Sequence, residues 1–148
     1  MTTTNEPSQQ QAYPEYREMI LQTTLSLAAA AAVLNFWLAV RTGKVRIGSK
    51  VWHGDGGNPI LLQRMRAHSN YVENTPFVLI LVAAIEMTGK GGTWLEVVGS
   101  LYMLARIAHA FGMDKAEQSP LRAIGFITTV LVLLGLSAIA VLIALGHF

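Results

Sequence analysis

Three polar side chains at helical spacing carry the strongest indication of chemistry in this sequence. At about 100° per residue, Arg66, Asn70 and Glu73 fall within a sector of roughly 60°, and Phe77 continues the same face. A guanidinium offers only hydrogen-bond donors, a carboxylate only acceptors, and an amide offers both. This combination predicts a site for a zwitterionic ligand, or a contact with another polar helix. Arg64 and His68 fall on the opposite side of the same helix.

The polar face borders an uncharged run, Asn74 to Ile85, which has the composition of a membrane-embedded segment. An ionised side chain near the middle of a membrane helix costs about 2.5–3.5 kcal/mol. The charged residues must therefore face a bundle interior, a water-filled cleft or the membrane interface. One interpretation is a structural Arg66–Glu73 ion pair that locks helices together. A ligand site is favoured, because ionisable groups within membrane segments are functional candidates by default.

The composition indicates an integral membrane protein of one domain. The 148 residues are 52% hydrophobic and 14% charged, and the formal net charge of +2 is too small to indicate a nucleic-acid partner. With no cysteine, the chain has no disulfide and no thiol nucleophile, so a reacting thiol must come from the substrate. The four histidines lack the spacing and carboxylate partners of a zinc or di-iron site, so no metal is expected.

The hydropathy pattern predicts an all-α membrane protein, a bundle of four transmembrane helices in residues 19–148, after a polar N-terminal tail in 1–18. Loops are expected at Arg41–Asn58, Gly89–Gly92 and Gly112–Pro120. Asn58-Pro59 and Ser119-Pro120 have the residue types that begin helices. Asn35 is predicted to hydrogen-bond another helix, and Gly125 and Gly135 to permit close helix packing. The four segments are Met19–Val40, about Pro59–Met87, about Trp94–Phe111, and the helix begun at Pro120, uncharged over Ala123–Gly146.

A second polar face is predicted on the third segment, where Tyr102, Arg106, His109 and Met113 share one side. Arg106 and His109 are therefore further candidates for substrate binding. The structural alternatives are an interior histidine bonded to a neighbour, and a salt bridge from Arg106 to Glu73 or Glu96.

The distribution of basic residues predicts how the bundle is oriented. Four spans place the first and third loops on one side, together with nine of the eleven basic residues. The positive-inside rule then places both loops and the polar cleft in the cytoplasm, and both termini outside. The nine are Arg41, Lys44, Arg46, Lys50, Arg64, Arg66, Arg106, Lys115 and Arg122.

One run of the sequence resembles a family motif: Arg66-Ala-His-Ser-Asn70-Tyr-Val-Glu73-Asn-Thr-Pro76. It is similar to the second-helix motif of the MAPEG family, the membrane-associated proteins in eicosanoid and glutathione metabolism. The Arg-Ala-x-x-Asn-x-x-Glu-x-x-Pro spacing is matched throughout, and the four-span layout agrees over about 130 residues. The family includes microsomal glutathione transferases and leukotriene C synthase.

The resemblance implies a homotrimer that holds glutathione, as co-substrate, in a cleft between neighbouring subunits. It assigns Arg66 to the tripeptide's carboxylate, Glu73 to its amino group and Asn70 to its polar backbone. Arg122 matches in position an arginine that stabilises the glutathione thiolate, which makes it the candidate catalytic residue. Arg41 is a further candidate contact with the substrate.

This sequence departs from the leukotriene synthase-like pattern at two places. His109 and Met113 stand where those members carry tyrosines on the third helix, and Asn74 replaces the aromatic residue that follows the glutamate. His109 could take over a tyrosine's hydrogen bond, or it could mark a changed substrate.

Three functions remain open on this reasoning. The leading one is a membrane glutathione transferase, or a peroxidase, that joins the thiolate to a hydrophobic electrophile or lipid arriving from the bilayer. The second is a non-catalytic lipid- or glutathione-binding membrane protein. The third is a proton-coupled transporter, for which Glu73 and Glu86 would supply the charge.

Overall fold

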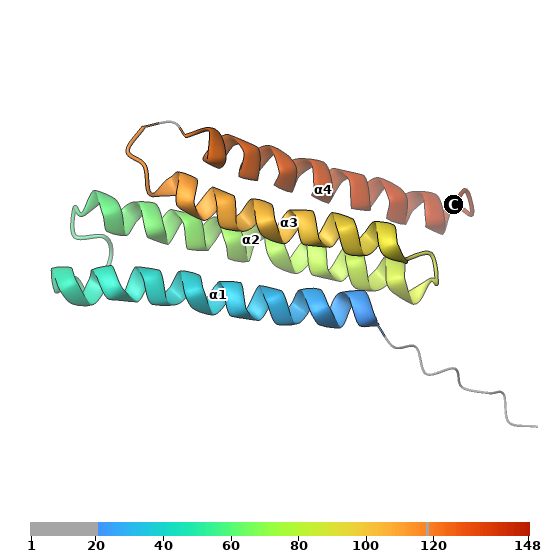
Figure 1. Ribbon diagram of the computed structural model, residues 1–148, viewed down its shortest axis with the longest axis horizontal. Helices are drawn as coiled ribbons and strands as arrows, with labels where there is room; N and C mark the ends of the chain where they lie inside the picture. The colour runs from blue at the N-terminus through green and yellow to red at the C-terminus, as the bar shows by residue number, and fades with distance from the viewer. Residues whose placement is uncertain (1–20, 118) are drawn as a thin grey trace, which may run out of the picture.

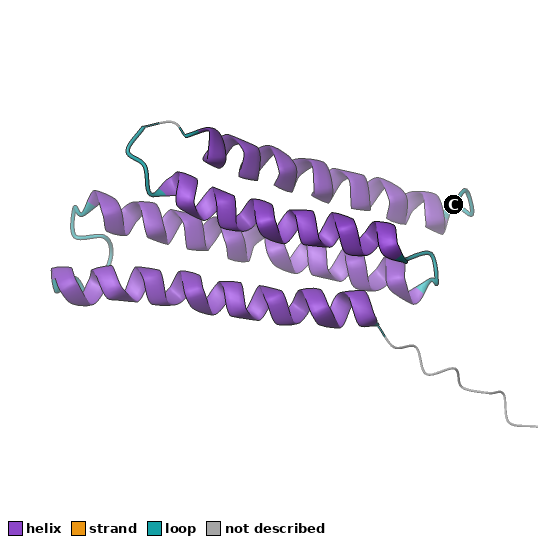
Figure 2. Cartoon of the chain, viewed as in Figure 1, coloured by secondary structure: helices purple, strands orange, loops and turns teal. Residues whose placement is uncertain are grey.

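The computed structural model describes residues 21–117 and 119–148, which form four helices (Figure 1). No strand occurs in this part of the chain (Figure 2). The bundle confirms the predicted all-α fold class. Its helices are α1 (Gln22–Ser49), α2 (Pro59–Met87), α3 (Thr93–Met113) and α4 (Pro120–Ala144).

Successive helices run antiparallel, so the connections alternate between the two ends of the bundle. The α1–α2 and α3–α4 loops lie at one end, and the α2–α3 turn lies at the other with the C-terminus (Figure 1). We call the first of these the basic end, defined by residues 50–58, 114–117 and 119. The predicted pairing of the first and third loops is confirmed.

Two helices form the centre of the bundle. α2 and α3 pack on each other and on both remaining helices, whereas α1 and α4 have no contact with each other. Aliphatic side chains such as Val78, Val82, Ile85 and Leu95 are fully buried between them. The outer surface is also apolar, with large exposed side chains along α4 in particular. In the described residues, α1 and α4 are long and apolar enough to cross a membrane, by length and composition.

The first helix extends beyond its predicted end at Val40. α1 continues to Ser49, so Arg41, Lys44 and Arg46 are helical and the predicted loop Arg41–Asn58 shrinks to Lys50–Asn58. Charges end the apolar segment, but they do not break a helix. The helix ends at Lys50, which adopts a left-handed conformation (φ 55°) and bonds back to the Arg46 and Ile47 carbonyls. The predicted tail, residues 1–18, lies outside the described part of the chain.

The second helix begins where the sequence predicts. The Asn58 side-chain oxygen accepts hydrogen bonds from the backbone N–H groups of Ile60 and Leu61, at 3.0 and 3.1 Å, and Pro59 occupies the first turn. α3 is longer than predicted by one residue at its start and two at its end, a difference typical of helix boundaries.

Glu86, near the end of α2, closes the beginning of α1. Its carboxylate accepts hydrogen bonds from the backbone N–H groups of Thr23 and Thr24, both at 2.8 Å, and from the Thr24 hydroxyl at 2.7 Å. A carboxylate at a helix N-terminus satisfies backbone donors that have no partner within the helix, and it opposes the positive end of the helix dipole. Packing between α1 and α2 therefore accounts for Glu86 without any transport role.

Candidate functional site

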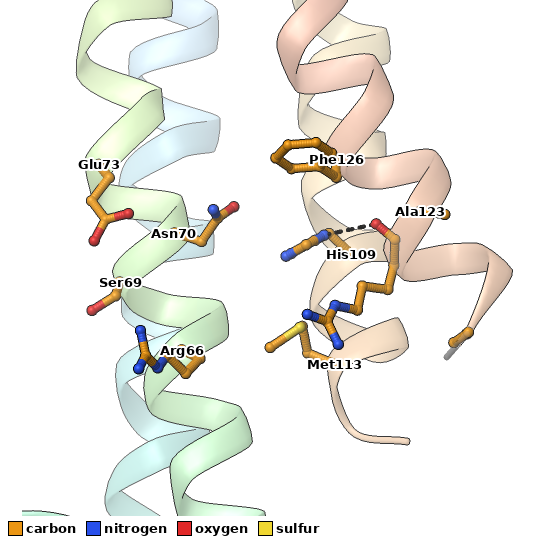
Figure 3. A pocket seen from close by; sticks show the side chains of 10 residues that line it. Arg66, Ser69, Asn70, Glu73, His109, Met113, Ala123 and Phe126 are labelled. Carbon is orange, nitrogen blue, oxygen red and sulfur yellow. Dashed lines mark hydrogen bonds between the residues drawn. The ribbon is translucent and has the colours of Figure 1, made fainter. Parts of the chain in front are cut away.

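A cavity of about 630 Å³ lies in the half of the bundle next to the basic end. α2 forms one wall, and α3 and α4 form the other (Figure 3). Its volume is typical of small-molecule sites, which measure about 300–1,000 Å³. The lining residues are Arg66, Ser69, Asn70, Glu73, His109, Met113, Ser119, Arg122, Ala123 and Phe126.

The α2 wall carries the polar face predicted from the sequence. Arg66, Asn70 and Glu73 all line the cavity, and Arg66 and Glu73 are exposed. The alternative of an Arg66–Glu73 ion pair is wrong, because the salt bridges among the described residues all involve Asp114. The Arg66 guanidinium, the Asn70 amide and the Glu73 carboxylate therefore line one cavity. This arrangement suits a ligand that carries both a negative and a positive group.

The side of α2 away from the cavity packs against α1. His68 Nε2 lies 2.8 Å from Asn35 Oδ1, which confirms the helix–helix hydrogen bond predicted for Asn35. Arg64 donates to the backbone oxygen of Arg41 at 3.0 Å. The predicted division of α2 into two polar sides therefore matches the structure.

On the opposite wall, His109 and Arg122 lie beside each other. His109 Nδ1 is 3.1 Å from the backbone oxygen of Arg122 (Figure 3). Because a carbonyl oxygen only accepts, Nδ1 must carry the hydrogen, and a neutral ring then presents Nε2 as an acceptor on the cavity side. The predicted bond from His109 to a neighbour is confirmed, and it leaves the second ring nitrogen available to a ligand.

Two glycines allow α3 and α4 to approach closely enough to make this wall. A Cβ at Gly125 would collide with His109 and with backbone of Ala105, and one at Gly112 would collide with the backbone of Arg122. The close packing predicted for Gly125 is therefore confirmed. Gly135 has no atom within 4 Å of the position its Cβ would take, so the same prediction finds no support at Gly135 within this chain.

Arg106 does not line the cavity but lies behind Asn70. It is 1% exposed, and its two terminal nitrogens donate to Asn70 Oδ1 at 2.6 Å and to Thr129 Oγ1 at 2.9 Å. The alternative of a salt bridge from Arg106 to Glu73 or Glu96 is therefore wrong. Arg106 therefore reaches the cavity lining by a hydrogen bond to Asn70.

Arg41 also lies away from the cavity. Its guanidinium carbon is 4.5 Å from the centre of the Trp37 ring and 5.4 Å from that of Phe111, and it forms an ion pair with Asp114. Asp114 lies 3.6 Å from Arg64 as well. The α3–α4 loop is thereby attached to α1 and α2, while the predicted contact between Arg41 and substrate stays a prediction.

Five lining residues were not identified as site residues from the sequence, although one of them, Met113, was placed on the second polar face. Ser69 and Phe126 lie one helical turn from Arg66 and Arg122, so helical spacing from those arginines would have found them. Ala123 directly follows Arg122. Ser119 is buried and its hydroxyl has no hydrogen-bond partner, although the sequence indicates only a helix start there. An unpartnered hydroxyl in the lining adds one more group for a ligand.

The fold and the site together define a class of protein: a four-helix membrane bundle with a polar cavity built from three of its helices. The chain belongs to the MAPEG family, whose family model matches residues 24–142, which confirms the resemblance seen in the α2 motif. It is 28% identical over 85 residues to the inner membrane protein YecN of Escherichia coli strain K12. The match covers 57% of this chain and 65% of YecN, and YecN of Escherichia coli O6:H1 strain CFT073 gives the same figures.

Proposed function

We propose that this protein is an integral membrane glutathione transferase. A peroxidase using the same thiolate is the variant of this proposal, in which two glutathione thiols reduce a hydroperoxide to an alcohol and water and become a disulfide. The observation that carries the proposal is the meeting of two walls in one cavity. Arg66, Asn70 and Glu73 on α2 face Arg122 on α4, and no ion pair within the described chain occupies these charges. Glutathione has matching groups: carboxylates, an ammonium group, amide bonds and a thiol.

In the proposed complex, α2 binds the peptide and the opposite wall activates its sulfur. Arg66 binds a carboxylate, Glu73 binds the ammonium group, and Asn70 bonds the peptide backbone. Arg122 stabilises the thiolate, which is the nucleophilic form of a thiol. The thiol proton passes to Nε2 of His109 or to water. The thiolate then forms a carbon–sulfur bond with the electrophile, whose leaving group departs or whose adjacent atom takes up a proton.

A hydrophobic electrophile has an apolar route to the sulfur. Phe126 and Ala123 extend the cavity lining along α4, whose outer face exposes Ile124, Ile127 and Leu131. A substrate dissolved in the membrane can reach this surface without crossing water. The proposal therefore includes a lipid or a lipid-soluble foreign compound as the second substrate.

Assembly and orientation belong to the same proposal. We place three copies around the membrane normal, so that a neighbouring subunit covers the open side of each cavity. The basic end then faces the cytoplasm, and both termini lie on the other side. Arg41, which lies outside the cavity of its own chain, is proposed to contact substrate held by a neighbouring copy.

The test is a titration of the detergent-solubilised protein with glutathione, followed by thiolate absorbance and by isothermal calorimetry. Wild type is expected to bind glutathione and to ionise its thiol. Arg122→Ala should keep binding within about threefold but lower turnover at least ~100-fold, because one preorganised donor to a developing anion contributes that much. Lys115→Ala removes an exposed positive charge at the same end and should behave as wild type. Loss of binding in Arg122→Ala with unchanged turnover contradicts its assigned role.

A second candidate is a glutathione- or lipid-binding protein without catalysis. It is favoured by the absence of tyrosine from the cavity lining in the described chain. Tyr71 and Tyr102 are buried and bond to the Ala31 oxygen and the Thr75 hydroxyl, at 2.8 and 2.9 Å. The same titration separates the two functions. Binding without thiolate absorbance, and without conjugation of a generic aromatic electrophile, supports the second candidate.

A further inference from the structure

Arg106 is a buried cation whose hydrogen-bond partners are both neutral. Its partners are the amide of Asn70 and the hydroxyl of Thr129, and the ion pairs among the described residues involve other arginines. Its third nitrogen, Nε, is buried and has no hydrogen-bond partner. A charge in a bundle interior is normally paired, because an unpaired one loses its hydration without compensation. The part of the chain that the structure describes therefore supplies no anion to Arg106.

The hydrogen bonds show where such an anion can be placed. On the α4 side, Thr129 accepts from Arg106 and donates its only hydrogen to the Gly125 oxygen at 2.8 Å, so it has no hydrogen left for an anion. On the α2 side, Arg106 reaches Asn70, which lines the cavity. The side chain of Asn70 extends from α2 toward α3 (Figure 3). The cavity is thus lined by a residue that bonds directly to Arg106.

Arg106 also determines which side-chain atom of Asn70 is available to a ligand in the cavity. A guanidinium has only donors, so the atom of Asn70 that faces it must be the oxygen. The Asn70 amide nitrogen, with two hydrogens, is then left for the ligand. Asn70 becomes a donor that is further polarised by a positive charge bonded to its oxygen.

We propose that Arg106 is the positioning residue of this cavity: it fixes Asn70 as a hydrogen-bond donor and makes the cavity select a ligand with an anionic or carbonyl oxygen beside Asn70. The choice of glutathione as that ligand rests on the function proposed above. The unpaired charge of Arg106 is a property of the free protein and is independent of that function.

The sharpest test gives Arg106 the anion that it lacks. Asn70→Asp places a carboxylate at the atom now bonded to Arg106, with almost no change in shape. The apparent melting temperature in detergent is expected to rise by about 4 °C or more, because a buried unpaired charge gains a partner. Affinity for glutathione is expected to fall about tenfold or more, because the donor is lost and the new charge repels an anion.

Asn74→Asp is the matched control, since it makes the same change one helical turn along α2. The Asn74 amide donates to the backbone oxygen of Asn70 at 2.7 Å, and the hydrogen bonds of the Arg106 guanidinium go to Asn70 and Thr129 instead. This variant should not raise the melting temperature. A fall or no change in melting temperature for Asn70→Asp means that Arg106 is already compensated, which overturns the proposal.

A double-mutant cycle tests the coupling to Asn70. Asn70→Ala and Arg106→Met should each lower the affinity for glutathione. The double variant should bind glutathione as tightly as the single variant with the lower affinity. Additive losses contradict a role that acts through Asn70. If Arg106→Met does not fold, the Asn70→Asp comparison decides. If wild type binds no glutathione, the proposed function fails, and the melting temperatures still test the charge on Arg106.

Discussion

Single side chains set the charge pattern that the cavity offers to a ligand. In the lining of the described chain, Glu73 supplies the negative charge, and Arg66 and Arg122 supply the positive ones. Together with Arg106 behind Asn70, the site carries more positive than negative charge. A ligand that neutralises it needs a net negative charge and one cationic group for Glu73, a description that glutathione fits.

Replacing Glu73 by glutamine tests the cationic end of that ligand. The side chain keeps its shape, but loses the charge that we expect to bind an ammonium group. Glutathione affinity should fall about tenfold, because a charge-assisted hydrogen bond becomes a neutral one. Calorimetry measures the affinity, and the melting temperature should stay within about 2 °C, because Glu73 is exposed.

Glu96→Gln, at an exposed position of α3 toward the other end, is the control. Equal affinity in both variants removes Glu73 from the site.

Some of these residues could be predicted from the sequence, and others could not. Arg66, Asn70 and Glu73 lie on one helix, where the 3.6-residue period alone decides that they share a face. The partners of Arg106 depend on how α3 is rotated against α2 and α4, which no spacing within α3 reveals. An arginine in a membrane segment indicates an acidic partner, but the structure gives Arg106 an amide and a hydroxyl instead.

The same contrast holds for whole helices. The start of α2 was predictable because Asn58 and Pro59 act through local bonds and local backbone geometry. The end of α1 was not predictable from the sequence. The helix ends because Lys50 adopts a left-handed conformation, which is typical of glycine and not of lysine. Hydropathy marks the limit of the apolar segment, and the helix continues for nine residues past it, from Arg41 to Ser49.

The approach of α4 to α3 brings His109 and Arg122 together, and Gly125 is required for it. Gly125→Ala should destabilise the protein by about 1–3 kcal/mol, because the added methyl meets backbone atoms and the His109 Cβ, which cannot easily move aside. The melting temperature should fall by at least ~3 °C. Glutathione turnover should fall too, because Arg122 moves with the start of α4.

Gly135→Ala provides the control on the same helix. The added methyl meets nothing within 4 Å, and alanine favours a helix over glycine by about 1 kcal/mol, so stability should stay equal or rise. Equal melting temperatures for the two variants would show that α4 can shift without cost, and that the α3–α4 contact does not hold the cavity wall in place.

Across the whole molecule, the cavity and the basic residues gather at the same end. The lining comes from the first half of α2, the last part of α3 and the first part of α4. The α2–α3 turn at the other end carries one basic residue, Lys90. Because of this asymmetry, the orientation of the protein in the membrane decides which compartment the cavity is nearest to. If the basic end faces the cytoplasm, the cavity opens toward the compartment in which thiols are kept reduced.

The chain has no cysteine, so single introduced thiols can report that orientation directly. Lys115 lies in the α3–α4 loop and Lys90 in the α2–α3 turn, and both are exposed. A membrane-impermeant maleimide added to intact cells should label Lys90→Cys and leave Lys115→Cys unmodified. Disrupting the cells should expose Lys115→Cys to the reagent, while the cysteine-free chain stays unlabelled throughout.

The reverse pattern would place the cavity on the outer side, where a reduced thiol substrate is scarce. In that case the transferase function would lose its source of glutathione, even if every contact in the site were correct.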